Sequence, residues 1–121
     1  MTLRPGARGE ATLVVGAADT ATALGSGDVA VLGTPRLVAL CEAATVAAVR
    51  HLLPQEQTTV GTRIDVEHLR PSPVGSTVSA TAVLVAVEGR RLMFEVEAAQ
   101  DGATVGRGTV ARAVVERARF G

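Results

Sequence analysis

Three polar side chains are candidates for chemistry: Thr34 before a proline, Glu42 within an apolar segment and His68 at the end of an alternating segment. A hydroxyl, a carboxylate and an imidazole are the groups that general-base and nucleophilic catalysis use. Glu42 is the only charged residue between Leu37 and Val49. Its carboxylate either lies on a solvated stripe with the arginines near the ends of that segment, or is buried with a partner. Burial would make Glu42 a candidate base.

His68 closes a segment with period-two alternation, which predicts a strand from Val60 to Leu69. Alternation places the imidazole on the apolar face, which it shares with Val60, Thr62, Ile64 and Val66, whereas Gly61, Arg63, Asp65 and Glu67 share the other. A half-exposed histidine at a strand end is the simpler interpretation, and a catalytic base is the alternative.

Thr34 precedes Pro35, and this pair is typical of a helix start, where the threonine hydroxyl caps free backbone N–H groups. The same position suits chemistry, because a helix N-terminus stabilises a carbonyl oxygen that is gaining negative charge. Cys41 lies in the apolar segment without an activating neighbour, so it is interpreted as a small buried hydrophobic residue.

The composition excludes several other mechanisms. All 12 basic residues are arginine, so no lysine is present to form a Schiff base or a P-loop, and a single cysteine allows no internal disulfide. Two distant histidines predict no metal site, and no cofactor is implied. Twelve acidic residues balance the basic ones, which argues against nucleic acid as a partner. Without a membrane span or a signal peptide, the expected location is cytoplasmic.

Residues 1–121 have the length of a single domain. A glycine-free apolar segment from Pro35 to Leu53, ended by Pro54, predicts a central helix covered on all sides. A weak strand is expected at Gly9–Val15. Four longer strands are expected at Val60–Leu69, Thr77–Val87, Arg91–Ala99 and Thr104–Glu116, joined in part by the hairpin signals Glu-Gly and Asp-Gly. The prediction is an α+β hotdog fold, an antiparallel sheet wrapped around one long helix, that pairs into a homodimer through an exposed sheet edge.

The motifs resemble those of the fluoroacetyl-CoA thioesterase-like family of hotdog proteins. The likeness runs from Leu32 to Glu116 and rests on Gly33-Thr34, Leu37-Val38-Ala39-Leu40-Cys41-Glu42-Ala43, Gly61-Thr62 with His68, Val87-Glu88-Gly89-Arg90-Arg91-Leu92, Gly106-Arg107-Gly108-Thr109 and Arg112-Ala113-Val114. The resemblance implies that Thr34, Glu42 and His68 form the catalytic group. It also implies that Gly61 and Arg112 contact the acyl-CoA.

The expected reaction is hydrolysis of an acyl-CoA or other acyl thioester. His68, oriented by Glu42, would deprotonate Thr34 or a water, with helix N–H groups or the Gly61 N–H holding the oxyanion. Thr34 and Glu42 lie eight residues apart, about 12 Å along a helix, so a compact group needs a folded-back loop or a second subunit. A water activated by Glu42 tolerates that separation. Dimer and tetramer, and CoA and acyl carrier protein, stay open at this stage.

Two other functions compete with hydrolysis. The first is hydration or dehydration of an acyl thioester, which needs an acidic partner near His68, and only Asp65 is close in sequence. The second is an acyl-CoA-binding module without turnover. The segment from Gly25 to Val31 departs from the family by lacking an aromatic lid, so the resemblance implies the reaction class rather than fluoroacetyl-CoA as the substrate.

Overall fold

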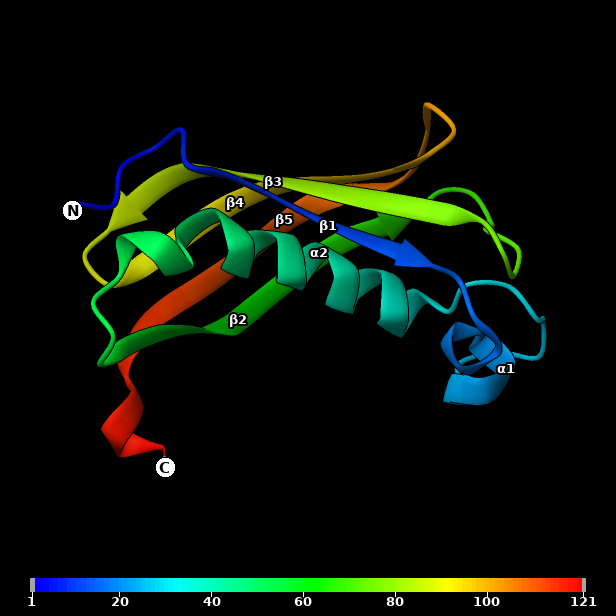
Figure 1. The fold of residues 1–121 in the computed structure, drawn as a ribbon, viewed down its shortest axis with the longest axis horizontal. Coiled ribbons are helices and arrows are strands. Elements are labelled where there is room, and N and C mark those ends of the chain that lie inside the picture. Colours follow the sequence, from blue (N-terminus) through cyan, green and yellow to red (C-terminus); the bar gives the residue numbers. More distant parts are fainter. Residues whose placement is uncertain (1, 121) are drawn as a thin grey trace.

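Five antiparallel strands form one sheet that curls around a single long helix (Figure 1). The computed structural model describes residues 2–120. The elements in chain order are β1 (Arg8–Val14), the 3-10 helix η1 (Ala17–Asp19), α1 (Ala21–Leu24), α2 (Thr34–Val49), η2 (Arg50–Leu52), β2 (Gln57–His68), β3 (Thr77–Glu88), β4 (Arg91–Gln100), β5 (Ala103–Glu116) and η3 (Arg117–Arg119). The strand order is β1-β3-β4-β5-β2, which leaves β1 and β2 at the edges. The predicted hotdog-like arrangement is confirmed.

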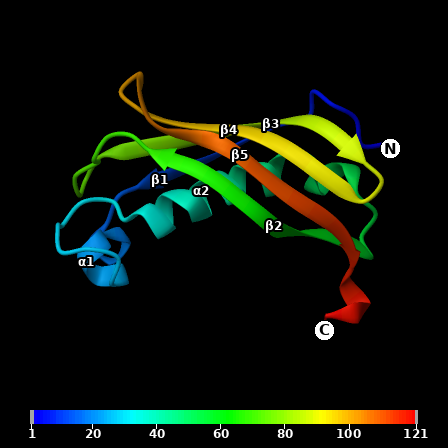
Figure 2. The same cartoon turned by 180° about the vertical axis from the view of Figure 1, so that it is seen from behind.

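The predicted hairpins form where the sequence supplies residues that accept positive φ. Gly89 joins β3 to β4 at φ +60°, and Asp101 and Gly102 join β4 to β5 at φ 51° and +78°. Two successive residues with positive φ define the turn whose twist matches that of the flanking strands. The resulting β3-β4-β5 meander forms the centre of the sheet, as Figure 2 shows from behind.

Helix α2 packs one face against the concave side of the sheet and leaves the other uncovered by this chain (Figure 1). The buried face includes Leu37, Leu40, Cys41 and Ala44, whereas Ala39 and Ala43 on the other face are exposed. The prediction that the helix is covered on all sides is therefore wrong for the single chain. Five curled strands surround only one side of the helix, so burial of its second apolar face requires contact with another chain.

The regular helix also ends before the predicted boundary at Leu53. Helix α2 ends at Val49, and the 3-10 helix η2 (Arg50–Leu52) follows before Pro54. Leu53 is extended, with φ −103° and ψ 145°, because a residue before proline is sterically kept out of the helical region.

Close contact between β1 and α2 explains the small residues in both elements. A Cβ added to Gly9 would overlap the backbone of Ala44 and Ala48 on the helix. Glycine on the strand and alanine on the helix bring the two backbones together, so the core is tight although the chain has only two aromatic residues. None of the helices within residues 2–120 has the length and apolar character that a membrane span requires.

Candidate active site

Thr34 and His68 are joined by a side-chain hydrogen bond, although 34 residues separate them in the sequence. Thr34 is the first residue of α2 and His68 the last residue of β2, and the distance from Thr34 Oγ1 to His68 Nδ1 is 2.8 Å. The expected capping role of Thr34 is wrong, because the N-cap is Gly33 and no side chain caps this helix. The threonine hydroxyl is instead directed to the imidazole.

Burial favours the neutral imidazole at His68. It lowers the pKa of His68, and a backbone hydrogen bond with Arg70 opposes the shift more weakly. The buried Nε2 atom has no hydrogen-bond partner within residues 2–120. Protonation would place a charge on this partly buried ring without an acceptor at the buried Nε2, which costs free energy. His68 is therefore suited to accept a proton at Nδ1 when the Thr34 hydroxyl donates to it.

A hollow of about 290 Å³ opens beside this pair. Its lining comes from the start of α2, the end of β2 and the segment around α1, and consists of Ala21, Ser26, Val31, Leu32, Thr34, His68, Leu69, Arg70 and Pro71. We call it the Thr34–His68 hollow. The two residues at its centre are the expected catalytic ones, and its walls are small or aliphatic side chains apart from Ser26 and Arg70.

The start of α2 offers fewer free donors than an ordinary helix N-terminus. Pro35 has no N–H, while the N–H groups of Gly33 and Arg36 donate to Asp19 and Gly33 carbonyls at 2.9 and 3.0 Å. Within residues 2–120, the Thr34 N–H donates to no backbone carbonyl. Of the helix N–H groups expected to hold an oxyanion, the amide of Thr34 is therefore the one left free. It belongs to the same residue as the hydroxyl that contacts His68.

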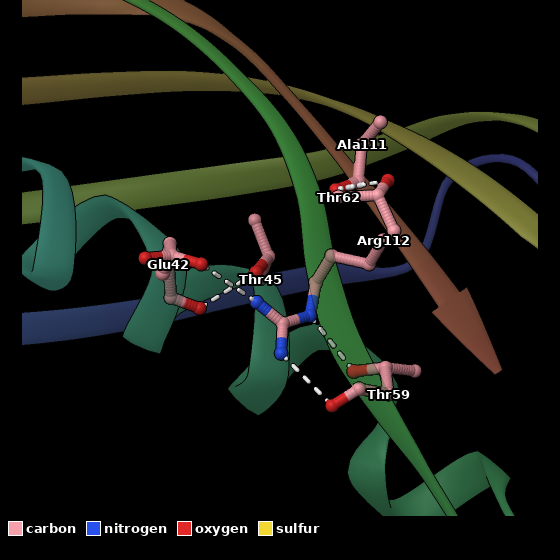
Figure 3. Close-up of polar contacts among 6 residues, drawn as sticks. All are labelled: Glu42, Thr45, Thr59, Thr62, Ala111 and Arg112. Atoms are coloured by element: carbon pink, nitrogen blue, oxygen red, sulfur yellow. Dashed lines mark hydrogen bonds and ion pairs between the residues drawn. The ribbon is translucent and has the colours of Figure 1, made fainter. Parts of the chain in front are cut away.

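A second polar cluster is centred on Arg112, whose side chain crosses from β5 toward α2 (Figure 3). Its Nη1 lies 3.2 Å from Glu42 Oε2, and its Nε and Nη2 donate to Thr59 Oγ1 and Thr59 O at 2.8 and 3.0 Å. Arg112 is only 6% exposed. Burial lowers its pKa, and the Glu42 carboxylate acts in the opposite direction. Three hydrogen bonds, one of which is also the ion pair with Glu42, hold this buried guanidinium in a fixed position.

Glu42 lies between the two alternatives considered for it. Its side chain is 34% exposed, so it is neither fully solvated nor buried, but it has the partner that the second alternative requires, Arg112. Gly61 lies directly against it, because a Cβ added to Gly61 would overlap Glu42 Oε2. Only glycine leaves room for the carboxylate here, and the Gly61 backbone becomes part of the cluster.

A bulge in β2 explains why the predicted faces of this strand are partly wrong. The pairing with β5 shifts between Gly61 and Arg63. Gly61, expected on the outer face, therefore points toward α2 together with His68, while Val60 turns outward. The extra residue of a bulge reverses the alternation, and no local signal in the sequence marks it. Asp65 keeps its predicted outer position opposite Thr109, so it does not face His68.

The single chain thus brings the five predicted site residues together in two groups rather than one. Thr34 meets His68, and Glu42 meets Gly61 and Arg112, but no hydrogen bond within residues 2–120 joins the groups. Thr59 belongs to the second group and was missed, since a threonine in a strand needs no explanation. Cys41 is fully buried as expected, and burial followed by the charge of Glu42 raises its pKa to about 11.

Comparisons with known proteins agree with this architecture. A family model described as fluoroacetyl-CoA-specific thioesterase matches residues 15–118. A fluoroacetyl-CoA thioesterase of Streptantibioticus cattleyicolor is 40% identical over 90 residues, or 74% of this chain and 65% of the relative, so the match spans just under two thirds of that protein. A solved structure of the fluoroacetyl-CoA thioesterase FlK has a TM-score of 0.92 at 34% identity, over 99% of this chain and 93% of that one.

A hot-dog-like protein from Thermanaerovibrio acidaminovorans extends the structural likeness, with a TM-score of 0.84 at 25% identity over 98% of this chain and 94% of that chain. Sheet, helix and matches together define a protein with the hotdog-like fold of thioesterases. Within this class the chain belongs to the fluoroacetyl-CoA-specific thioesterase family, which confirms the family expected from its motifs.

Proposed function

We propose that this chain hydrolyses an acyl-CoA thioester to the free acid and the thiol. The observation that carries the proposal is the 2.8 Å contact between Thr34 Oγ1 and His68 Nδ1 beside an open hollow. The relative from Streptantibioticus cattleyicolor is a fluoroacetyl-CoA thioesterase, and membership in the same family supports acyl-CoA hydrolysis by this chain. The cytoplasmic location expected from the sequence is part of this proposal.

The chemistry follows from the environment of His68. Neutral Nδ1 accepts a proton from the Thr34 hydroxyl, or from a water held there, and the oxygen attacks the thioester carbonyl carbon. The carbonyl oxygen becomes an oxyanion next to the Thr34 N–H. Collapse breaks the C–S bond, and the thiolate leaves with the proton held by His68. If Thr34 itself attacks, a water then hydrolyses the acyl-threonine by the same proton transfers.

A homodimer completes the proposed site. β2 is an edge strand with unpaired backbone groups, and its Ile64 side chain is 38% exposed next to the uncovered face of α2. Antiparallel pairing of β2 with a second β2 about a two-fold axis near Ile64 would set Gly61 opposite the partner's His68. Glu42 and Arg112 would then face the partner's Thr34. Such pairing removes the edge and supplies the cover that α2 lacks.

The proposed substrate is a short acyl group on CoA. The hollow of about 290 Å³ is lined mainly by small and aliphatic side chains, and the segment from Gly25 to Val31 forms part of its wall without an aromatic residue. A change in this wall alters the acyl specificity of the site more easily than it alters the reaction. We therefore expect a short acyl group other than fluoroacetyl to be the preferred substrate.

Thiol release from a panel of acyl-CoAs, from fluoroacetyl and short linear to branched, aromatic and long chains, tests the proposal. Wild type is compared with Thr34→Ala, Glu42→Gln and His68→Ala, and native mass spectrometry gives the oligomeric state. Hydrolysis of a short-chain member, lost in His68→Ala, is expected. CoA binding without turnover across the panel would identify an acyl-CoA-binding module instead.

A further inference from the structure

The outer face of the sheet, opposite α2, carries a groove of about 580 Å³ that the proposed reaction does not use. It lies between the β3–β4 hairpin and the bulge in β2, and is lined by Thr62, Arg63, Glu88, Arg90, Arg91 and Ala113. We call it the three-arginine groove. Its position next to the bulge puts it on the same stretch of β2 as Gly61, the residue that touches Glu42 on the other face.

The groove carries more positive than negative side chains. Three guanidiniums and one carboxylate line it, and none of Arg63, Arg90 and Arg91 forms an ion pair within residues 2–120. The chain as a whole has no net charge. The neighbouring hollow on the same face is different, because its two arginines face three glutamates. An excess of cations confined to one groove favours an anionic ligand there.

Alanines keep the groove open between its charged walls. Arg63 is paired across the strands with Ala111, and Arg91 with Ala113. Ala111 is buried, whereas the methyl group of Ala113 lines the groove and leaves room for a ligand between the arginines. Arg63 comes from the edge strand, and Arg90 and Arg91 from the hairpin, so guanidiniums line the groove from two sides.

We propose that the three-arginine groove binds phosphate groups, and that its ligand is the phosphorylated nucleotide of the CoA thioester, an assignment that rests on the proposed function. A guanidinium donates two parallel hydrogen bonds to one phosphate, and several arginines suit a ligand with more than one phosphate. CoA carries a diphosphate and a 3′-phosphate. The groove would then hold the carrier, while the Thr34–His68 hollow holds the acyl group.

Calorimetric titration of the full chain with adenosine 3′,5′-bisphosphate tests this without turnover, so its outcome is independent of hydrolysis. Wild type is expected to bind, and Arg63→Gln and Arg90→Gln are each expected to weaken binding about tenfold, the loss of one charge-assisted contact. Arg107→Gln, on the same face in the neighbouring hollow, is the matched control and should bind like wild type. Absence of binding, or equal binding in all variants, overturns the proposal.

Further binding and kinetic measurements identify the source of the phosphate. If inorganic pyrophosphate binds the groove but the KM for acyl-CoA is the same in Arg63→Gln as in wild type, the phosphate chemistry stands and the assignment to CoA is wrong. If KM rises for acyl-CoA and not for the matching acyl-pantetheine, the assignment to CoA is supported. If Arg63→Gln weakens binding of an acidic acyl carrier protein and leaves bisphosphate binding unchanged, the groove is a protein-docking site and the proposal is overturned.

Discussion

Replacement of Arg112 by methionine is expected to destabilise the fold mainly through the loss of donors to Thr59. Arg112 is 6% exposed and donates to two acceptors of Thr59, the side-chain oxygen and the carbonyl. Each buried acceptor left without a donor costs about 1–3 kcal/mol. Glu42 is 34% exposed, so water solvates its carboxylate and the ion pair adds at most about 1 kcal/mol. We expect Arg112→Met to lower the free energy of unfolding by about 2–4 kcal/mol.

A double-mutant cycle with Thr59→Val separates this contact from other effects of the substitution. The four proteins are unfolded in urea at equilibrium and compared by their free energies of unfolding. If the Thr59 contact is responsible, the two substitutions are coupled by about 1–2 kcal/mol, because valine removes the acceptor that Arg112→Met leaves unpaired. Additive effects within about 0.5 kcal/mol would refute the reasoning. Glu42→Gln serves as the control, since it keeps both contacts to Thr59.

Three other predictions follow from individual residues. Because burial lowers the pKa of His68, the inflection at which protonation of the base reduces kcat/KM for acyl-CoA hydrolysis should lie below the ordinary histidine value of 6.5; an inflection above 6.5 in a pH profile contradicts this. Gly9→Ala should destabilise by about 1–3 kcal/mol because its Cβ overlaps the α2 backbone, whereas Gly27→Ala, which meets its neighbour at 3.5 Å, should change urea stability little. Cys41, with a pKa of about 11, should react with a thiol reagent at pH 8 only after unfolding; rapid labelling of the native protein would show that it is accessible.

The arrangement of elements was predictable because each has a simple cause in the sequence. Period-two segments and hairpin turns predicted the four strands after Pro54, and the glycine-free apolar segment predicted α2. Thr34 was singled out by its position before Pro35 at a helix start and His68 by its place on the apolar face of a strand, and the structure joins them. The motif likeness supplied Gly61 and Arg112, which composition alone does not mark.

The parts that could not be predicted depend on contacts between distant segments. The bulge after Gly61 reverses the faces of half of β2, and it is set by the pairing with β5 rather than by local sequence. The partner of Glu42 lies 70 residues away in the sequence. The sequence around an arginine on a strand does not indicate whether its side chain points toward the core. Whether one chain covers α2 depends on how far the curled sheet reaches, which periodicity does not encode.

The position of β2 has a consequence for the order in which the protein folds. Both groups of site residues use this strand, through His68 at its end and Gly61 at its centre, yet β2 pairs only with β5, beyond the whole β3–β4 hairpin. Contacts between neighbouring strands form before those that close a long loop. We therefore expect the β3-β4-β5 meander to form the folding nucleus and β2 to join it late. Substitutions in β2 should then accelerate unfolding more than they slow folding, so the site would be the first part of the sheet to open.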